Sequence, residues 1–455
     1  MRDARKRIQL AIVFLLGSCG FPALPMVAGG GGDDAHVEGD AKLDAPSNML
    51  TITASPSRFI VHTGDLRETH ITITNGTAQS GTPTLGVSGL TNSGMTFTAN
   101  TCTTELAPGG TCTAIGNLSG GIPAAEEDFQ VTASSAALGT AMAAMSVIVR
   151  PFCALTCGAN GTANCCASSV VAGNAVGASL AGTAYYRIYD VGTDGMYTNM
   201  NYPATVSDFR LDKYLVTVGR FREFVNAGMG TQSSPPAAGD GARPLNGIAN
   251  QGGWDSSFNT SLASSTIALT TALKCSAARQ TWTDIAGSNE SLPINCLTWY
   301  EAAAFCAWDG GFLATLAEGQ YATSGGSEQR AYAFSNPPSS LTFDCTYANY
   351  SANFTTFCTG SGVANRVGSE SPKGDGKWGQ SDLVGNLYDW ALDWGNMLTG
   401  SCDNCAALIP EGGVNFRSMR GGPFDGPPKR GGATFVIATP ATRSYEIGAR
   451  CARFQ

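Results

Sequence analysis

Apolar and polar residues alternate in short runs between Met49 and Val149, as in His70-Ile71-Thr72-Ile73-Thr74. Clusters of Gly, Asn and Ser separate these runs at intervals of roughly 8–12 residues, which is the strand spacing of an antiparallel sandwich. In a strand with this alternation, one face packs on a core and the other faces solvent. The pattern therefore predicts an all-β sandwich over residues 48–150.

The hydrophobic pattern changes in the last 270 or so residues. An apolar run at 209–217 predicts a strand, and Phe221, Phe224 and Val225 follow at helical spacing, so they are expected to face a core. The chain contains 57 Gly, about twice the usual share of roughly 7%. This composition favours short strands and long loops over helical bundles. The sequence predicts a second domain of mixed structure over residues 184–455.

The N-terminus has the pattern of a bacterial export signal. Basic residues precede the apolar run Leu10 to Leu16, which is too short to span a bilayer. The run ends in Leu16-Gly17-Ser18-Cys19, which resembles a lipobox. We therefore expect a signal peptide over 1–18 and a lipid on Cys19 that anchors the chain to the outer membrane, displayed on the periplasmic side or at the cell surface. Plain secretion or a periplasmic location is the alternative.

Residues 19–47 are rich in Gly, Ala, Pro and Asp, with no periodic apolar positions. Such a segment cannot bury enough apolar surface to fold by itself. We expect a flexible tether.

The charge and the histidines exclude several classes of protein. The formal net charge is −8, which is a poor match for nucleic acid. The three histidines, His36, His62 and His70, all precede the second domain. A Ser-His-Asp triad or a His-ligated zinc site is thus excluded there.

Fifteen cysteines behind an export signal indicate an oxidised framework. Cys275 with Cys296 and Cys345 with Cys358 form expected local pairs. The segment 151–183 is a cysteine-rich linker in which a disulfide knot is favoured over zinc; its cysteines are Cys153, Cys157, Cys165 and Cys166.

Cys402-Asp403-Asn404-Cys405 is a C-x-x-C sequence, a spacing shared by redox motifs. It lacks the flanking strand and helix of a thioredoxin, so a bridge that stiffens the loop is favoured.

Three blocks of the second domain carry a family resemblance: the run from Ser381 to Trp390 (SDLVGNLYDW), Arg420-Gly421-Gly422, and the terminal run from Gly448 to Phe454 (GARCARF). They resemble the G-N-x-W-E-W, R-G-G-S-W and G-F-R-C-A-R blocks of the formylglycine-generating enzymes, or sulfatase-modifying factors. Residues 209–217, 297–308 and an eroded block at 313–322 extend the resemblance over nearly all of 184–455. It implies an α+β, C-type-lectin-like domain with short strands, few helices and long loops.

A second resemblance concerns the sandwich. Cys102 and Cys112 flank the turn Leu106-Ala107-Pro108-Gly109, as in bacterial immunoglobulin-like modules, which implies a Cys102–Cys112 disulfide. A spacer role is favoured for this domain because no polar cluster stands out.

The family resemblance implies bound calcium as a structural brace. Its ligands map to the side chains of Asp382 and Asp389 and to the carbonyls of Gly385 and Leu387. The bland alternative is that both carboxylates only cap the turn. Asn349 aligns with a second calcium site without a secure partner. The resemblance also implies a Cys306–Cys451 disulfide.

Enzymes of this family use two cysteines, a few residues after the R-G-G block, to bind copper and oxidise a sulfatase cysteine to formylglycine. Gly426 and Gly431 occupy these positions. Copper(I) selects soft thiolates, so copper is not expected. The residues of the expected ligand groove are Arg420, Phe424, Asp425, Arg430 and Arg443. For the basic residues Arg420, Lys429, Arg430 and Arg443, a solvated basic rim is the plainer interpretation.

Three functions remain open at this stage. The favoured hypothesis is a non-catalytic envelope protein whose second domain is a disulfide- and calcium-braced scaffold that binds a glycan, a peptide or a surface protein. The alternatives are an active formylglycine-generating oxidase and a purely structural envelope protein.

Overall fold

The computed structural model describes residues 49–62, 66–122, 124–150, 168–174, 185–189, 200–396, 398–427 and 436–453. The predicted signal peptide, Cys19 and the tether lie outside these ranges, as do Arg430, Gly431 and the four cysteines of the linker. Within the described ranges, no helix has the length and apolar character needed to cross a membrane.

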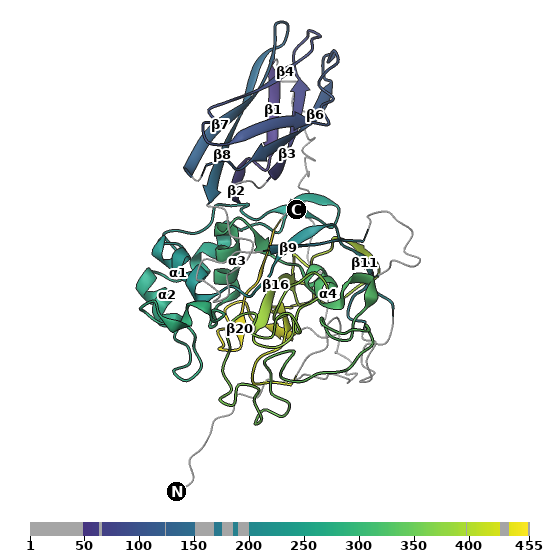
Figure 1. Cartoon of the computed structure of the whole chain (residues 1–455). Helices are drawn as coiled ribbons and strands as arrows, with labels where there is room; N and C mark the ends of the chain where they lie inside the picture. Colours follow the sequence, from purple (N-terminus) through teal and green to yellow (C-terminus); the bar gives the residue numbers. More distant parts are fainter. Residues whose placement is uncertain are drawn as a thin grey trace, which may run out of the picture. The chain divides into compact units, whose positions relative to one another are not determined.

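The first domain is an immunoglobulin-like sandwich of two four-stranded sheets, with strand orders β1-β3-β6-β5 and β2-β8-β7-β4 (Figure 1). All strand pairs are antiparallel except β2 with β8. The strands are β1 (Leu50–Ser55), β2 (Arg58–His62), β3 (Leu66–Asn75), β4 (Thr84–Ser88), β5 (Gly94–Thr98), β6 (Thr111–Ser119), β7 (Ala124–Ser135) and β8 (Gly139–Arg150).

Alternation in the sequence produces the sandwich core. Along β3 every second residue is buried, so Ile71 and Ile73 face inward from one sheet while Val131 and Val147 face them from the other. The Cys102–Cys112 disulfide joins this cluster, with its Cα atoms 5.1 Å apart. The predicted all-β architecture is thus confirmed.

In its described residues the second domain has four short α-helices, each with a Ser or Thr N-cap that accepts a hydrogen bond from the first turn. The helices are α1 (Val218–Asn226), α2 (Thr266–Ala272), α3 (Trp299–Trp308) and α4 (Leu316–Ser324), with 3₁₀ turns η1 (Ser256–Ser261), η2 (Ser288–Ser291) and η3 (Gly326–Glu328). In α3 and α4 the cap belongs to a full capping box, Thr298 with Glu301 and Thr315 with Glu318.

In the residues that the structure describes, the strands of the second domain form four small sheets, ordered β15-β21-β12-β9, β19-β18-β16-β20, β10-β11-β17 and β13-β14. Strand β9 belongs to the segment 151–183 that was predicted as a linker, and it pairs with β12 of the second domain. They are β9 (Ser168–Val171), β10 (Tyr185–Tyr186), β11 (Pro203–Thr205), β12 (Phe209–Asp212), β13 (Arg243–Leu245), β14 (Ile248–Gln251), β15 (Phe312–Leu313), β16 (Tyr388–Trp394), β17 (Cys402–Asp403), β18 (Arg417–Gly421), β19 (Val436–Ala438), β20 (Ile447–Gly448) and β21 (Cys451–Arg453).

Helix α3 and strand β21 are joined in the core of this domain. Phe221, Phe224 and Phe305 pack together with ring centroids 5.2–5.6 Å apart, and the disulfide between Cys306 and Cys451 lies in the same buried cluster. The helical spacing expected for Phe221 and Phe224 therefore does place both rings inside. The domain is α+β with few helices and long loops, as predicted.

Candidate functional site

The turn that precedes β16 is built from left-handed backbone. Asp382, Gly385 and Asn386 have φ values of +57°, +84° and +63°. Gly385 has a steric reason to be glycine, because a Cβ there would lie 2.6 Å from the carbonyl oxygen of Asn349. This turn brings the buried Asp382 carboxylate against Gly368, whose N–H donates to Oδ2 at 2.8 Å.

A cluster of buried oxygen atoms surrounds Asp382. The side-chain amide of Asn386 donates to Asp382 Oδ1 at 3.4 Å, and that of Asn349 donates to the Asn386 side-chain oxygen at 3.5 Å. The Asn365 amide donates to Glu370 at 2.6 Å. The side-chain oxygens of Asn349 and Asn365 are buried and accept no hydrogen bond. Buried oxygens of this kind are unfavourable unless a donor or a cation satisfies them.

The two carboxyl groups of this cluster have raised pKa values. Burial, and then the negative charge of Asp382, raise the pKa of Glu370 to about 7. Burial is also the main cause that raises the pKa of Asp382 to about 6. A hard cation such as calcium would relieve both effects and satisfy the amide oxygens. Among the residues that the structure describes, no three His, Cys, Asp or Glu side chains converge as a metal group, so amide and carbonyl oxygens would have to complete the ligand set.

Asp389 differs from Asp382 in its surroundings. Its Oδ2 lies 3.1 Å from Nη2 of Arg420 and 3.4 Å from Nε of Arg450, and all three side chains are buried. Two guanidinium groups thus balance its charge through Oδ2, while its Oδ1 is buried and accepts no hydrogen bond. The other two mapped ligands are the carbonyls of Gly385, in the turn described above, and of Leu387, a fully buried residue of a separate apolar cluster.

Sequence reasoning missed Asn365 and Glu370. Both lie in a loop without hydrophobic periodicity, and only the fold brings them to Asp382. No local signal in the sequence points to them, because the turn at Gly368 between them, with a φ of +69°, is known only from the structure.

The segment Pro423-Phe424-Asp425-Gly426 occupies the position of the first family cysteine. Gly426 closes a turn by donating to the Pro423 carbonyl at 3.3 Å, and its own carbonyl accepts from Ser351 N–H at 3.0 Å. Phe424 is buried beneath this turn, so it lies inside rather than along a groove. Gly426 is described and is held on both sides, whereas Gly431 falls outside the described residues.

Charged and aromatic side chains gather beside Gly426. Arg279 is ion-paired with Asp425, donates to the Tyr445 hydroxyl at 3.0 Å, and lies 4.8 Å from the centre of the Tyr445 ring. Burial, and then the charge of Asp425 and a hydrogen bond to it, raise the pKa of Glu446 to about 7. Glu446 therefore holds its proton to a higher pH than an exposed glutamate does.

Phe354 adds an aromatic surface at the same turn. It is 66% exposed, has a φ of +63°, and its ring lies near Gly426. A large apolar side chain held in the left-handed region is unusual and is a candidate contact residue. We call Arg279, Phe354, Asp425, Tyr445 and Glu446 the Gly426 face.

Arg420 and Arg443, the two described arginines of the predicted groove, are bound within the fold. Arg420 is buried and donates to Thr323 Oγ1 at 2.8 Å as well as to Asp389. Arg443 is ion-paired with Glu301 and donates to the Cys296 carbonyl at 2.8 Å. They are not a solvated basic rim. Gly319 makes room for Arg420, since a Cβ at Gly319 would lie 2.1 Å from Arg420 Nε.

Every cysteine in the described ranges is in a disulfide. The pairs are Cys102–Cys112, Cys275–Cys296, Cys306–Cys451, Cys345–Cys358 and Cys402–Cys405. Thiols in such bridges are not available as copper ligands while the bridges are intact. This many bridges indicates an oxidising, extracytoplasmic compartment.

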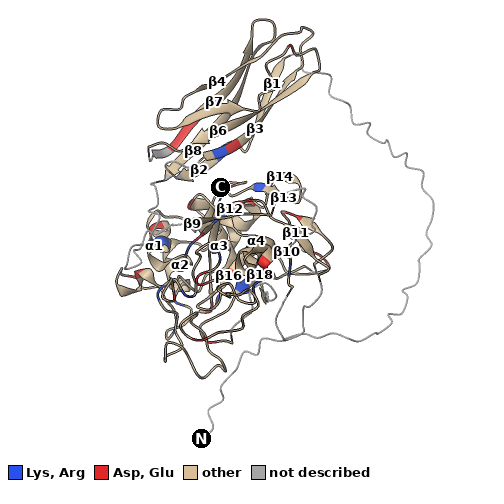
Figure 2. Cartoon of the chain, turned by 45° about the vertical axis from the view of Figure 1, so that its right-hand side comes forward, with Lys and Arg blue, Asp and Glu red and all other residues tan. Residues whose placement is uncertain are grey.

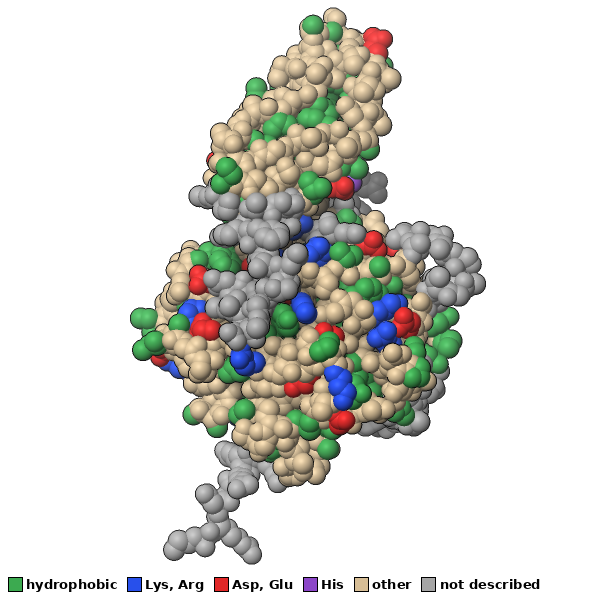
Figure 3. Space-filling model, viewed as in Figure 1, with side chains coloured by type: hydrophobic (Ala, Val, Ile, Leu, Met, Phe, Trp, Pro, Cys, Tyr) green, Lys and Arg blue, Asp and Glu red, His purple; other side chains and the backbone are tan. Residues whose placement is uncertain are grey.

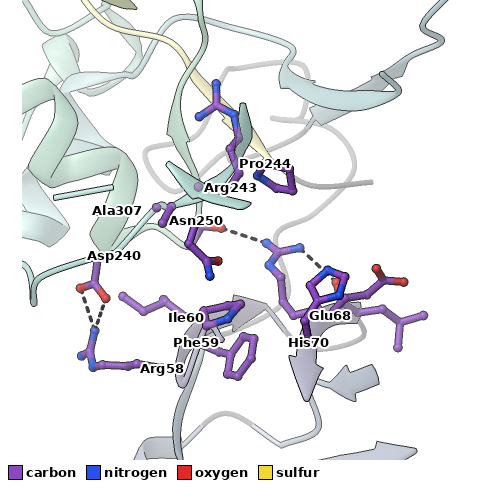
Figure 4. A pocket seen from close by; sticks show the side chains of 18 of the residues that line it. Arg58, Phe59, Ile60, Glu68, His70, Asp240, Arg243, Pro244, Asn250 and Ala307 are labelled. Atoms are coloured by element: carbon purple, nitrogen blue, oxygen red, sulfur yellow. Dashed lines mark hydrogen bonds and ion pairs between the residues drawn. The ribbon is translucent and has the colours of Figure 1, made fainter. Parts of the chain in front are cut away.

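A separate pocket of about 420 Å³ is lined by residues of β2 and β3 and by the segment around β13 (Figure 4). Arg58 and Asp240 point toward one another there and form a bidentate pair at 2.6 and 2.7 Å. Phe59, Ile60 and Pro244 supply apolar wall. Arg58 is also ion-paired with Glu126. Glu68 and His70 line the same pocket, so its wall is charged as well as apolar.

Surface charge is sparse and mixed in sign. Acidic and basic side chains are interspersed on the face shown in Figure 3, and few positions of the sandwich strands are charged (Figure 2). Neither view has the broad basic stripe that marks a nucleic-acid footprint. This agrees with the acidic overall composition.

Fold and site together define the class of this protein. It is an extracytoplasmic protein whose second domain is an α+β fold with few helices and several disulfides, and an immunoglobulin-like sandwich precedes that domain. Residues 178–455 match the sulfatase-modifying factor enzyme 1-like domain, and the chain belongs to that family.

Individual relatives are more distant. The chain is 27% identical over 225 residues to the formylglycine-generating enzyme of Mus musculus, which covers 46% of this chain and 56% of that enzyme. It is 30% identical over 132 residues to the serine/threonine-protein kinase pkn1 of Chlamydia caviae, covering 29% of this chain and 19% of the kinase. The chain thus spans less than two thirds of either relative. Among solved structures, the chain is similar to the BIgI domain of beta protein from S. agalactiae bound to CEACAM1. The match covers 23% of this chain and 98% of that domain, with 10% sequence identity and a TM-score of 0.16.

Proposed function

We propose that this protein is an exported, non-catalytic member of its family, whose second domain binds an extracellular ligand. The observation that carries the proposal is Gly426, which stands where the family has its first copper-binding cysteine and is fixed there by two backbone hydrogen bonds. A glycine offers copper no side-chain ligand.

The Gly426 face is the proposed binding surface. It combines an exposed aromatic ring at Phe354, an amphipathic ring at Tyr445, and charged groups at Arg279, Asp425 and Glu446. Aromatic rings with adjacent hydrogen-bonding groups suit sugars and peptides. The rigid support would come from the fold, which the Cys306–Cys451 disulfide and the hydrogen-bonded turn at Asp382 hold together.

Calcium is the proposed structural cofactor, and the Asp382 cluster is its proposed site. Asp382, Glu370, Asn349 and Asn365 would hold it, and it would neutralise the two carboxylates that repel each other. The role is a brace for the loop from Asn349 to Asn386 and not chemistry on a substrate.

The signal pattern and Cys19 support export with a lipid anchor at the outer membrane. The immunoglobulin-like sandwich would then act as a spacer that carries the binding domain away from the membrane. Acyl-chain labelling of the wild type and of Cys19→Ser in a bacterial host tests the anchor.

A binding screen tests the function. Soluble protein that begins after Cys19 is applied to immobilised glycans and peptides, with Phe354→Ser and Asp425→Asn as variants of the Gly426 face. Ile285→Ser, at an exposed position elsewhere, is the control. The proposal predicts a ligand that both face variants lose by about tenfold or more and that the control retains. Equal ligand binding by the wild type, the two face variants and the control would contradict the assignment of this face as the binding surface.

A further inference from the structure

The Cys402–Cys405 disulfide lies in the wall of a second pocket, of about 420 Å³, apart from the Gly426 face. Both cysteines are half-buried, and both line this pocket. By contrast, Cys306 and Cys451 are fully buried. A disulfide must be reachable before a thiolate can attack it. Cys402–Cys405 meets that condition and Cys306–Cys451 does not.

Arg187 contacts one sulfur of the bridge. Its Nη1 lies 3.3 Å from Cys405 Sγ, while Nη2 donates to the carbonyls of Thr399 at 3.1 Å and Gly400 at 2.7 Å. Arg187 is buried, and its Nε is without a hydrogen-bond partner. A fixed guanidinium beside a sulfur stabilises the thiolate form of that sulfur. Cys405 is therefore set up as the leaving group when the bridge is opened.

The loop that carries the bridge is held by hydrogen bonds independent of the sulfurs. Asn246 exchanges two hydrogen bonds with Ala406, at 2.8 and 3.0 Å, and Asn404 donates to Ser207 Oγ at 2.8 Å. Strand β17, which contains Cys402, pairs with β11. The two thiols of the reduced form would thus stay close together, so that the bridge can form again.

Exposed apolar side chains border the same pocket. Ile248 is 57% exposed and Ile409 is 75% exposed, and both line it together with Leu408 and Trp394. Isolated exposed apolar residues are ordinary, but a group around one pocket marks an interaction site. An apolar rim around a disulfide suits a polypeptide that presents cysteines among apolar residues.

We propose that Cys402–Cys405 is a thiol–disulfide exchange site whose substrate is a cysteine pair in an extended polypeptide. A substrate thiolate attacks Cys402 Sγ, which forms an intermolecular disulfide and breaks the bond to Cys405. Cys405 leaves as a thiolate beside Arg187. The second substrate thiolate then attacks the substrate sulfur of the mixed disulfide and releases Cys402. The substrate pair is oxidised to a disulfide, Cys402 and Cys405 are reduced, and the two substrate protons pass to them.

Redox equilibration of the full chain tests the first part. The protein is incubated at graded ratios of reduced to oxidised glutathione, the thiols are trapped, and each pair is quantified by peptide mass spectrometry. Cys345–Cys358 is the matched control, because Cys345 is exposed and Cys358 is half-buried. We expect Cys402–Cys405 to open at a ratio at least about tenfold lower than the control requires. If Cys402–Cys405 resists reduction by glutathione as much as Cys345–Cys358 does, or more, the proposal is overturned.

Variants test the roles of the surroundings. Arg187→Gln should make the bridge about tenfold harder to open, since the Cys405 thiolate loses its partner. If that variant does not fold, Ile248→Ser with Ile409→Ser provides the second measurement. This pair should slow the reaction with a dithiol peptide that has apolar flanks, and leave the reaction with a Gly- and Ser-flanked peptide unchanged. Ile267→Ser, at a position that is 79% exposed and outside the pocket, should change neither rate. Unchanged rates with both peptides in the rim variant overturn the polypeptide substrate.

Discussion

The carboxylate of Asp389 lies 3.1 Å from Nη2 of Arg420, and both side chains are buried. In the family pattern the residue at the Asp389 position is a calcium ligand. Here the shorter carboxylate serves a buried ion pair that Arg450 completes at 3.4 Å. Its role is therefore expected to be structural.

Asp389→Ala should lower the free energy of unfolding by about 3–5 kcal/mol, because it leaves two buried guanidinium groups without their carboxylate. Urea denaturation measures this change. Asp403→Ala, at an exposed position, is the control and should change stability by less than about 1 kcal/mol. A small effect of Asp389→Ala, together with a loss of calcium affinity, would restore the role that the family pattern implies.

Calcium should bind at the Asp382 cluster. Asp382→Asn and Glu370→Gln are each expected to weaken calcium binding by about tenfold or more, since each removes a hard, charged ligand from a small set. Isothermal titration of EDTA-treated protein measures the affinity. Asp344→Asn changes a solvent-exposed carboxylate and should leave the affinity as it is. Absence of calcium binding by the wild type would leave the cluster as a hydrogen-bonded turn.

Calcium should also stabilise the folded protein. At a free concentration of 100 times the dissociation constant, the free energy of unfolding should rise by about 2.7 kcal/mol. The increase in melting temperature on adding calcium is the measurement. Magnesium is the control ion, because it demands a tighter octahedral geometry than loop amides supply.

The Cys306–Cys451 disulfide should contribute more stability than any other described bridge. It closes a loop of 145 residues, for which the chain-entropy account gives about 5 kcal/mol. The double variant Cys306→Ala with Cys451→Ala tests this by urea denaturation. The bridge Cys402–Cys405 spans only three residues, so its double alanine variant should lose about 2 kcal/mol or less. Equal losses would show that loop length does not decide the effect.

The pH dependence of stability should reveal Glu446. Burial and the Asp425 charge raise its pKa to about 7 in the folded protein, against about 4.3 in an unfolded chain. The folded state therefore holds this proton more tightly, and the stability that it provides is lost as pH rises from about 4.5 through 7. Comparing wild type with Glu446→Gln by urea denaturation across that range isolates this contribution. As pH rises, the free energy of unfolding of the wild type should fall relative to that of Glu446→Gln. A constant difference would mean that Glu446 titrates as in the unfolded chain.

The architecture was accessible from the sequence because its signals are local. Alternation in residues 49–149 produced the sandwich, and the Thr298 and Thr315 capping boxes lie within the blocks 297–308 and 313–322 that carry the family resemblance. The five described disulfides agree with pairings expected from short spacings and from the family pattern. Local periodicity and spacing determine such features.

The environment of the charged residues was not accessible in the same way. Nothing local to Arg420 shows that a glycine at Gly319, on another element, leaves space for its side chain. Likewise, Asn365 and Glu370 reach Asp382 only through the path of a loop without periodicity. The C-x-x-C bridge was expected to be a loop brace, and only the structure adds Arg187 and the apolar rim to it. These contacts are long-range and depend on the whole fold.

Mass spectrometry of a sulfatase-motif peptide tests the central claim most directly. The peptide is incubated with the purified full-length protein, copper and oxygen, and its cysteine is followed for the exchange of sulfur for oxygen that formylglycine formation requires. With Gly426 and Gly431 in place of both family cysteines, we predict that the cysteine stays intact. Conversion above the level seen with copper alone would contradict the non-catalytic assignment.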